Sequence, residues 1–134
     1  MSLSRNSLTP GALVLGAGGN VGFGVVGALL EAGSPVLAVG REGPRMSALA
    51  EHFDDEPGLD LLHAPCIHDD RDAARLAEQV RERDRPLRAV FASMGTPPQS
   101  GRLLDRPASF LLERLEADLI PHLAAARHLL PLLA

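Results

Sequence analysis

The sequence predicts a Rossmann-type α/β fold, with a parallel sheet and helices on both of its faces. Short apolar runs of strand length alternate with helical segments at the spacing of βαβ units. A glycine-rich turn stands between the first apolar run and the first helical segment. Right-handed crossovers then give the strand order 3-2-1-4, with a ligand-binding switch point between strands 1 and 4.

The composition fits one globular domain and excludes several classes of function. The chain has 134 residues, of which 46% are hydrophobic, enough for one sizeable core. Its net charge of −4 argues against a nucleic-acid or anionic-membrane surface, because both need a basic patch. A single cysteine, Cys66, allows no internal disulfide and favours a reducing cytoplasm. We expect residues 1–10 to be a loose lead-in and residues 11–134 to form the domain.

The first βα unit occupies residues 11–33. The apolar run 12–16 is typical of a strand buried on both faces of a parallel sheet. The turn Ala-Gly-Gly-Asn follows, with Asn20 as the expected helix N-cap. The helix ends before Gly33. Its expected inner face consists of Val21, Val25, Ala28 and Leu29.

The same stretch has an alternative interpretation as a membrane span or signal peptide. It is long enough, since no charge occurs from Gly11 to Leu30. Seven glycines in these twenty positions, with Asn20 among them, disfavour a spanning helix. Only Arg5 precedes the stretch, whereas a signal peptide needs a cluster of positive charge.

Three further strands and three helices follow. We expect strands over 34–40, 59–65 and 86–93. The helix over 41–53 has Pro44 in its first turn, and the amphipathic helix over 69–84 turns Ala73, Leu76, Ala77 and Val80 inward. A Gly/Pro-rich loop over 94–107 precedes a long helical segment over 108–134, which Pro121 and Pro131 interrupt.

The glycine-rich turn is a candidate phosphate site. Glycines let the backbone bend tightly and approach a pyrophosphate, which the N-terminus of the following helix attracts. The alternative is a turn that only joins a strand to a helix. Strand 4 ends at the same edge of the sheet, so its last residues belong to the same candidate site. These cofactor-binding candidates are Gly16, Gly18, Gly19, Asn20, Val21, Gly22, Ala92, Ser93, Met94 and Gly95.

Together these motifs resemble the short-chain dehydrogenase/reductase family over residues 11–134. Residues 15–22 resemble the family turn Thr-Gly-x-x-x-Gly-x-Gly, with Asn20 for the middle glycine, and equally fit Gly-x-x-Gly-x-x-Gly. Ala92-Ser93-Met94-Gly95 stands where the family has Asn-Asn-Ala-Gly, and Cys66-Ile67 stands where it has Asp-Val. Residues 116–133 resemble the helix that carries the family's catalytic Asn, and Asp118 stands at that position.

The resemblance implies hydride transfer between NADP and a carbonyl or alcohol, but the departures are substantial. Without Asp at position 66 the family's carboxylate contact to the adenine is missing, and Asp118 has no N–H to donate. The family's Ser and Tyr-x-x-x-Lys fall beyond this chain, which contains no Tyr and no Lys. The chain therefore resembles the first half of such an enzyme, cut before strand 5 and inactive by itself. A non-catalytic dinucleotide-binding or sensor module, and a scaffold without nucleotide, remain as alternatives.

The residues after strand 2 favour NADP over NAD. An acid there would bind the ribose 2′-hydroxyl of NAD, and residues 38–41 contain none. Arg41 suits the 2′-phosphate of NADP, and Arg45 is a second candidate. The alternative is that both are ordinary surface arginines.

Three other groups of residues remain to be interpreted. His63, Cys66 and His68 are residue types that bind zinc, but side chains alternate along a strand, so His63 and Cys66 should lie on opposite faces. We therefore expect no metal site. Asp69 and Asp70 are expected to cap the helix that follows. Pro121 frees the carbonyl of Ala117, where the family's kink helps to hold a relay water; a simple kink is the alternative. The last helical segment has an apolar face rich in leucine, which could pack on the core or form the contact of a homo-oligomer. Its leucines are Leu111, Leu112, Leu115, Leu119, Leu123, Leu129 and Leu130.

Overall fold

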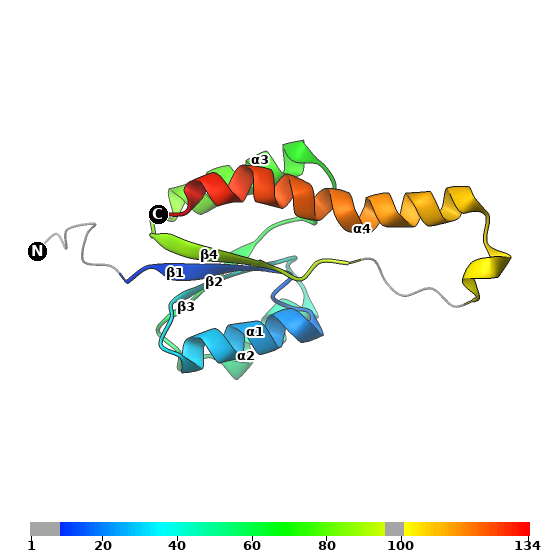
Figure 1. Cartoon of the computed structure of the whole chain (residues 1–134). Coiled ribbons are helices and arrows are strands. Elements are labelled where there is room, and N and C mark those ends of the chain that lie inside the picture. Colours follow the sequence, from blue (N-terminus) through cyan, green and yellow to red (C-terminus); the bar gives the residue numbers. More distant parts are fainter. Residues whose placement is uncertain (1–8, 96–100) are drawn as a thin grey trace, which may run out of the picture.

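A computed structural model describes residues 9–95 and 101–134 of the chain and shows a sheet between two layers of helices (Figure 1). Residues 1–8, most of the expected lead-in, and 96–100, part of the expected loop, lie outside the described residues. All strand pairs are parallel, and the order β3-β2-β1-β4 confirms the predicted topology. The strands are β1 (Gly11–Leu15), β2 (Val36–Gly40), β3 (Leu59–His63) and β4 (Leu87–Ala92).

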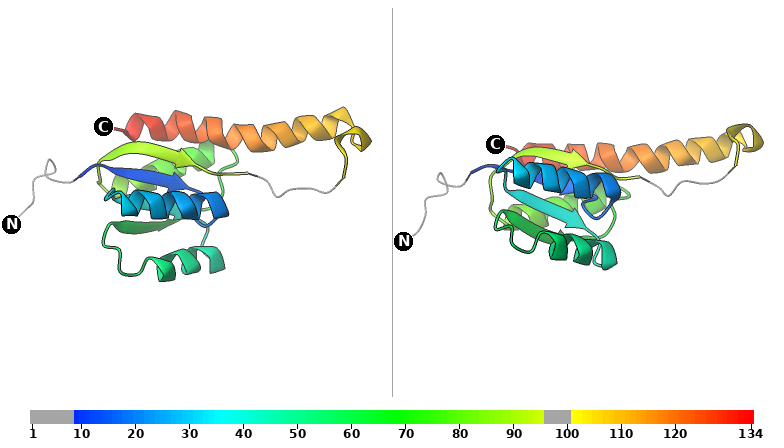
Figure 2. Two further views of the ribbon diagram at one scale, coloured as in Figure 1. Left: turned by 60° about the horizontal axis from the view of Figure 1, so that its bottom comes forward. Right: turned by 90° about the horizontal axis from the view of Figure 1, so that it is seen from below.

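Helices cover both faces of the sheet, as Figures 1 and 2 show. One face carries α1 (Asn20–Glu31) and α2 (Pro44–His52), and the other carries α3 (Asp70–Glu82) and α4 (Ala108–Leu129). Single 3₁₀ turns precede and follow α4, namely η2 (Leu103–Asp105) and η3 (Leu130–Leu132). In the part of the chain that is described, no helix is long and apolar enough to cross a membrane.

The alternation of side chains along the strands divides the core into two clusters. Leu13 and Leu15 point to the α3/α4 side, whereas Val14 between them points to the α1/α2 side. Both faces of β1 are therefore buried, which explains its uninterrupted apolar sequence. Burying each such side chain stabilises the fold by about 1.5–3 kcal/mol before entropy is counted.

The inner face of α1 differs in part from the predicted one, because Val25 and Leu29 pack against the core but Val21 and Ala28 do not. Val21 is 66% exposed and Ala28 is exposed, while Gly22 and Val26 are buried. The cause is the close contact between Gly22 and the turn before the helix, which sets the rotation of α1 about its axis. The N-cap is also Gly19 and not Asn20, which is already the first helical residue.

Helix α4 is continuous through Pro121, so the predicted interruption there is wrong. Proline removes only one main-chain hydrogen bond from the ladder. His122 Nδ1 donates to the carbonyl oxygen of Asp118 at 2.8 Å, one residue after the carbonyl that loses its partner at Pro121. The helix ends at Leu129, and Pro131 lies in the 3₁₀ turn beyond it.

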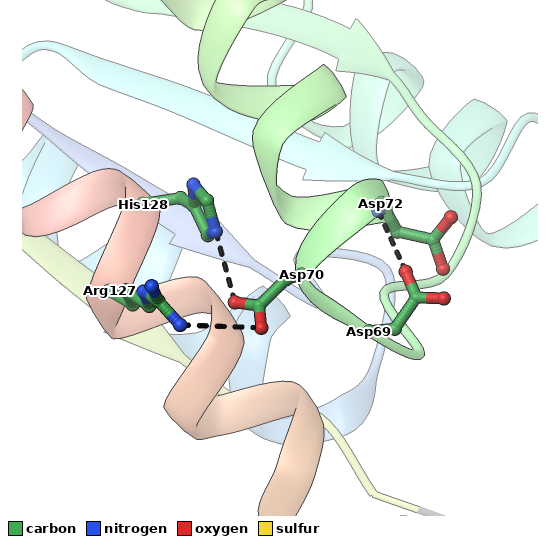
Figure 3. A network of polar contacts seen from close by, with 5 residues as sticks. All are labelled: Asp69, Asp70, Asp72, Arg127 and His128. Carbon is green, nitrogen blue, oxygen red and sulfur yellow. Dashed lines mark hydrogen bonds and ion pairs between the residues drawn. The ribbon is translucent and has the colours of Figure 1, made fainter.

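The start of α3 lies beside the end of α4 (Figure 3). Asp69 caps α3 as predicted, since its Oδ1 accepts from the main-chain N–H of Asp72 at 2.9 Å. Asp70 is not a cap. It is the first residue of the helix, and its carboxylate lies 3.0 Å from His128 Nε2 and 3.6 Å from Arg127 on α4. These side chains link the two helices, although solvent screens the contacts.

The outer edge of β4 is largely open. Leu133 forms a single parallel bridge with Leu87, and the N–H of Ala134 donates to the Leu87 carbonyl at 2.9 Å. From Arg88 to Ala92, β4 pairs with no described residue on this side. Phe91, on this edge strand, is 41% exposed.

Candidate functional site

The turn after β1 is tight and is held by main-chain hydrogen bonds. Gly16 has a φ of +70°, a left-handed conformation that favours glycine. The N–H of Gly19 donates back to the Gly16 carbonyl at 3.0 Å. The N–H of Ala17 donates to the Val39 carbonyl at 3.1 Å, which attaches the turn to the end of β2.

Two glycines of the turn have no room for a side chain, and a third has little. A Cβ on Gly16 would lie 2.1 Å from the carbonyl oxygen of Ser93, so the ends of β1 and β4 are in direct contact. A Cβ on Gly22 would lie 2.0 Å from the Gly16 carbonyl oxygen, and one on Gly18 would lie 3.1 Å from Cβ of Arg45. The glycines therefore let α1, β4 and α2 approach one short turn.

The N-terminus of α1 is left without a side-chain cap. Gly19 has no side chain that could accept a hydrogen bond, and the first turn of the helix contains no acid. The N-cap residue and the first turn therefore offer no side-chain acceptor to the main-chain N–H groups of Asn20, Val21 and Gly22. With the positive end of the helix dipole, they form a place suited to an anion.

One arginine lies against this turn, and another follows the neighbouring strand. Arg45, in the first turn of α2, lies against Gly18. Arg41 directly follows β2, and both arginines are exposed. From the sequence, Arg41 was the first candidate for binding the 2′-phosphate, because it stands at the end of the strand. The structure shows the contact with the turn at Arg45, because Gly43 and Pro44 start α2 close to that edge.

The strand ends contribute mostly small or main-chain groups to this edge. Ala92 and Gly95 are exposed, and Ser93 is half-buried with its N–H donating to the Leu15 carbonyl at 3.1 Å. Met94 packs against the core cluster. After β3, Cys66 is exposed, whereas Ile67 is buried in the core. The Ile67 side chain is thus occupied by packing, and only its main chain is left for a ligand.

Asp118 lies in the middle of α4, whose first half extends past the sheet (Figure 1). Its Oδ2 accepts from Arg114 Nε at 3.3 Å, one helical turn earlier. The two side chains keep 45% and 27% of their surface, respectively. A charge-paired aspartate cannot replace the neutral amide of an asparagine as a hydrogen-bond donor.

The expected zinc-ligand types do not form a cluster. His63, the last residue of β3, and Cys66, after the strand, are both exposed. Within residues 9–95 and 101–134, no group of three or more His, Cys, Asp or Glu side chains is placed to hold a metal ion.

Comparison with known proteins gives matches among solved structures alone. No protein-family model and no curated protein matches this chain. The NADPH-bound carbonyl reductase from chicken fatty liver has a TM-score of 0.76 at 22% identity, over 94% of this chain and 49% of its own. The Pseudomonas aeruginosa RhlG/NADP complex has a TM-score of 0.78 at 23% identity, over 98% and 51%.

A short-chain type dehydrogenase/reductase from Mycobacterium ulcerans matches with a TM-score of 0.75 at 18% identity, over 93% of this chain and 46% of its own. This chain thus spans about half the length of the structures that it matches. Over that length, it has the Rossmann-type fold of short-chain dehydrogenase/reductase structures.

Proposed function

We propose that this chain binds NADP(H) at the glycine-rich turn, as the cofactor-binding part of a short-chain oxidoreductase. The observation that carries the proposal is the uncapped, acid-free N-terminus of α1 at the contact between the ends of β1 and β4. The main-chain N–H groups of residues 20–22 would hold the pyrophosphate. The bound NADP(H) of two structures with the same fold supports the choice of ligand.

The two arginines would select the phosphorylated cofactor. Arg45 beside Gly18 and Arg41 after β2 offer guanidinium groups to a 2′-phosphate. The nicotinamide-side ribose would pass Ser93 and Met94, and the main chain of Cys66 and Ile67 would face the adenine. NAD is the weaker candidate because residues 38–41 contain no acid to bind its 2′-hydroxyl.

The chemistry of the whole protein is then hydride transfer between NADP and a carbonyl or alcohol. The cofactor supplies the hydride, and this chain holds and orients the cofactor. Since the sequence contains no Tyr and no Lys, the family's proton donor is not among its residues. Asp118 stands at the position of the family's catalytic Asn, but we assign it no role in proton transfer. The exposed thiol of Cys66 suits a reducing compartment, and we propose the cytoplasm.

Titration of the purified chain with NADPH and with NADH, followed by cofactor fluorescence, tests this proposal. We expect saturable binding with the lower Kd for NADPH. Arg45→Ala should raise the Kd for NADPH about tenfold and leave that for NADH nearly unchanged, because a charge-assisted hydrogen bond is lost. Arg75→Ala, on α3 at the other face of the sheet, is the matched control and should change neither.

The outcomes separate the alternatives for function. A folded chain that binds neither cofactor at millimolar concentration would be a scaffold, and the dinucleotide proposal would be wrong. If a cofactor binds, the coding sequence after residue 134 separates the other two: a Ser and a Tyr-x-x-x-Lys there would indicate the oxidoreductase, and a stop codon would favour the sensor module.

We also propose that α4 mediates self-association. Its exposed apolar side chains repeat at helical spacing beyond the sheet, and they are Leu112, Leu115, Leu119, Ile120 and Leu123. Sedimentation equilibrium should show a dimer that Leu115→Glu with Leu119→Glu converts to monomer, because two buried charges would disfavour the contact. Glu113→Gln on the same helix should leave the dimer intact. A monomer at every concentration of the unmodified chain would contradict the proposal.

A further inference from the structure

A second candidate site is an open hollow between α1 and the segment that follows α2. Its volume is about 540 Å³. Its walls include Phe23 and Gly27 of α1 and His52 and Phe53 at the end of α2. His52 ends α2 and Arg45 lies in its first turn, about 10 Å of helix away. The hollow is therefore distinct from the glycine-rich turn.

Three rings form a continuous aromatic wall in this hollow. The ring centroid of Phe23 lies 5.1 Å from that of His52 and 5.4 Å from that of Phe53. His52 and Phe53 meet edge to face at 4.6 Å. Gly27 makes room for them, because a Cβ there would lie 3.3 Å from Cζ of Phe53. Half of the chain's four phenylalanines are in this wall.

Negative charge surrounds the rings. The carboxylates of Glu31 and Glu56 line the hollow, and neither forms an ion pair or side-chain hydrogen bond with any residue in the described ranges. Asp54 and Asp55 follow the aromatic pair in the chain. The Asp55 side chain raises the pKa of the Asp54 carboxyl, through a hydrogen bond and through its charge. Among the described residues, no arginine lines the hollow to offset these acids.

We propose that this hollow binds a small organic cation with a quaternary ammonium head. Ring faces attract such a cation through their quadrupoles, and nearby carboxylates compensate its charge. A methylated ammonium has no N–H and so needs no oriented acceptor, which fits the unfixed carboxylates of Glu31 and Glu56. A guanidinium, in contrast, requires a carboxylate held in fork geometry. The acids disfavour phosphates and nucleotides.

The direct test is NMR titration of the full chain with choline, using its uncharged isostere 3,3-dimethylbutan-1-ol in parallel. We expect choline to shift the amide signals of Phe23, Gly27, His52 and Phe53 and to saturate in the millimolar range. The isostere should bind at least fivefold more weakly, because it lacks the charge. Arginine amide is a third probe and should also bind more weakly than choline.

Matched variants assign the binding to rings and carboxylates. Phe53→Leu should raise the Kd for choline about tenfold, while Phe91→Leu, the same change on β4, should leave it unchanged. Glu31→Gln with Glu56→Gln should raise it about fivefold, while Glu113→Gln with Glu116→Gln on α4 should not. Both glutamates of the hollow are exposed, so their variant tests binding without disturbing the core.

Three results would overturn the proposal. Equal affinity for choline and its isostere would show an apolar hollow that does not recognise charge. Tighter binding of arginine amide would show a guanidinium site. Shifts that do not saturate, or that map outside these residues, would show that the hollow binds no such cation. None of these results depends on whether NADPH binds at the glycine-rich turn.

Discussion

Gly22→Ala is expected to lower the free energy of unfolding by about 2–4 kcal/mol. The added Cβ would lie 2.0 Å from the carbonyl oxygen of Gly16 and 2.8 Å from its carbon, both of them main-chain atoms. That carbonyl cannot easily withdraw, because it accepts the hydrogen bond of Gly19 and because Gly16 is in contact with Ser93. Relief requires α1 to move away from the sheet, which opens the core around Val26.

Urea unfolding followed by circular dichroism measures this loss, and Gly24→Ala is its control. Gly24 lies in the same helix with no atom within 4 Å of a Cβ. Alanine should therefore stabilise the protein at that position by about 0.5–1 kcal/mol, through helix propensity alone. The displaced helix of Gly22→Ala should also lose its affinity for NADPH. Equal stability of the two variants would show that the turn and α1 are not in close contact.

Leu129→Ala should be the most destabilising truncation in α4, by about 2–5 kcal/mol. Leu129 is fully buried and belongs to the cluster that contains Leu13 and Leu87. Its removal leaves a cavity between the helix and the sheet, at the point where the last turn of α4 docks. Since the first half of α4 has exposed apolar residues, docking relies on this end of the helix.

The neighbouring Leu130→Ala is the matched control, because that side chain is 52% exposed. It should change the free energy of unfolding by less than about 1 kcal/mol. Thermal melts of both variants at a concentration where the chain is monomeric give the comparison. Similar losses would mean that α4 packs differently from the arrangement in Figure 1.

Local patterns were sufficient to predict most of the fold. Apolar runs of strand length, spaced by amphipathic segments, predicted four parallel strands in the order that the structure shows. The capping role of Asp69 also followed from its position before an amphipathic helix. Contacts between segments that are far apart in the sequence were harder to predict. The role of Asp70 was predicted wrongly, because its partners on α4 are 57 and 58 residues away in the chain.

The sequence by itself determined the class of fold, the strand order and the position of the glycine-rich turn. These depend on hydrophobic period and on the conformational freedom of glycine, which are properties of short segments. Only the tertiary structure decided which face of α1 is buried, which arginine lies against the turn and which end of α4 docks on the sheet. Each of these depends on how closely two separate segments approach, as at Gly22, at Gly18 beside Arg45, and at Leu129. Side-chain volume at such contacts affects the free energy only after the segments have packed together.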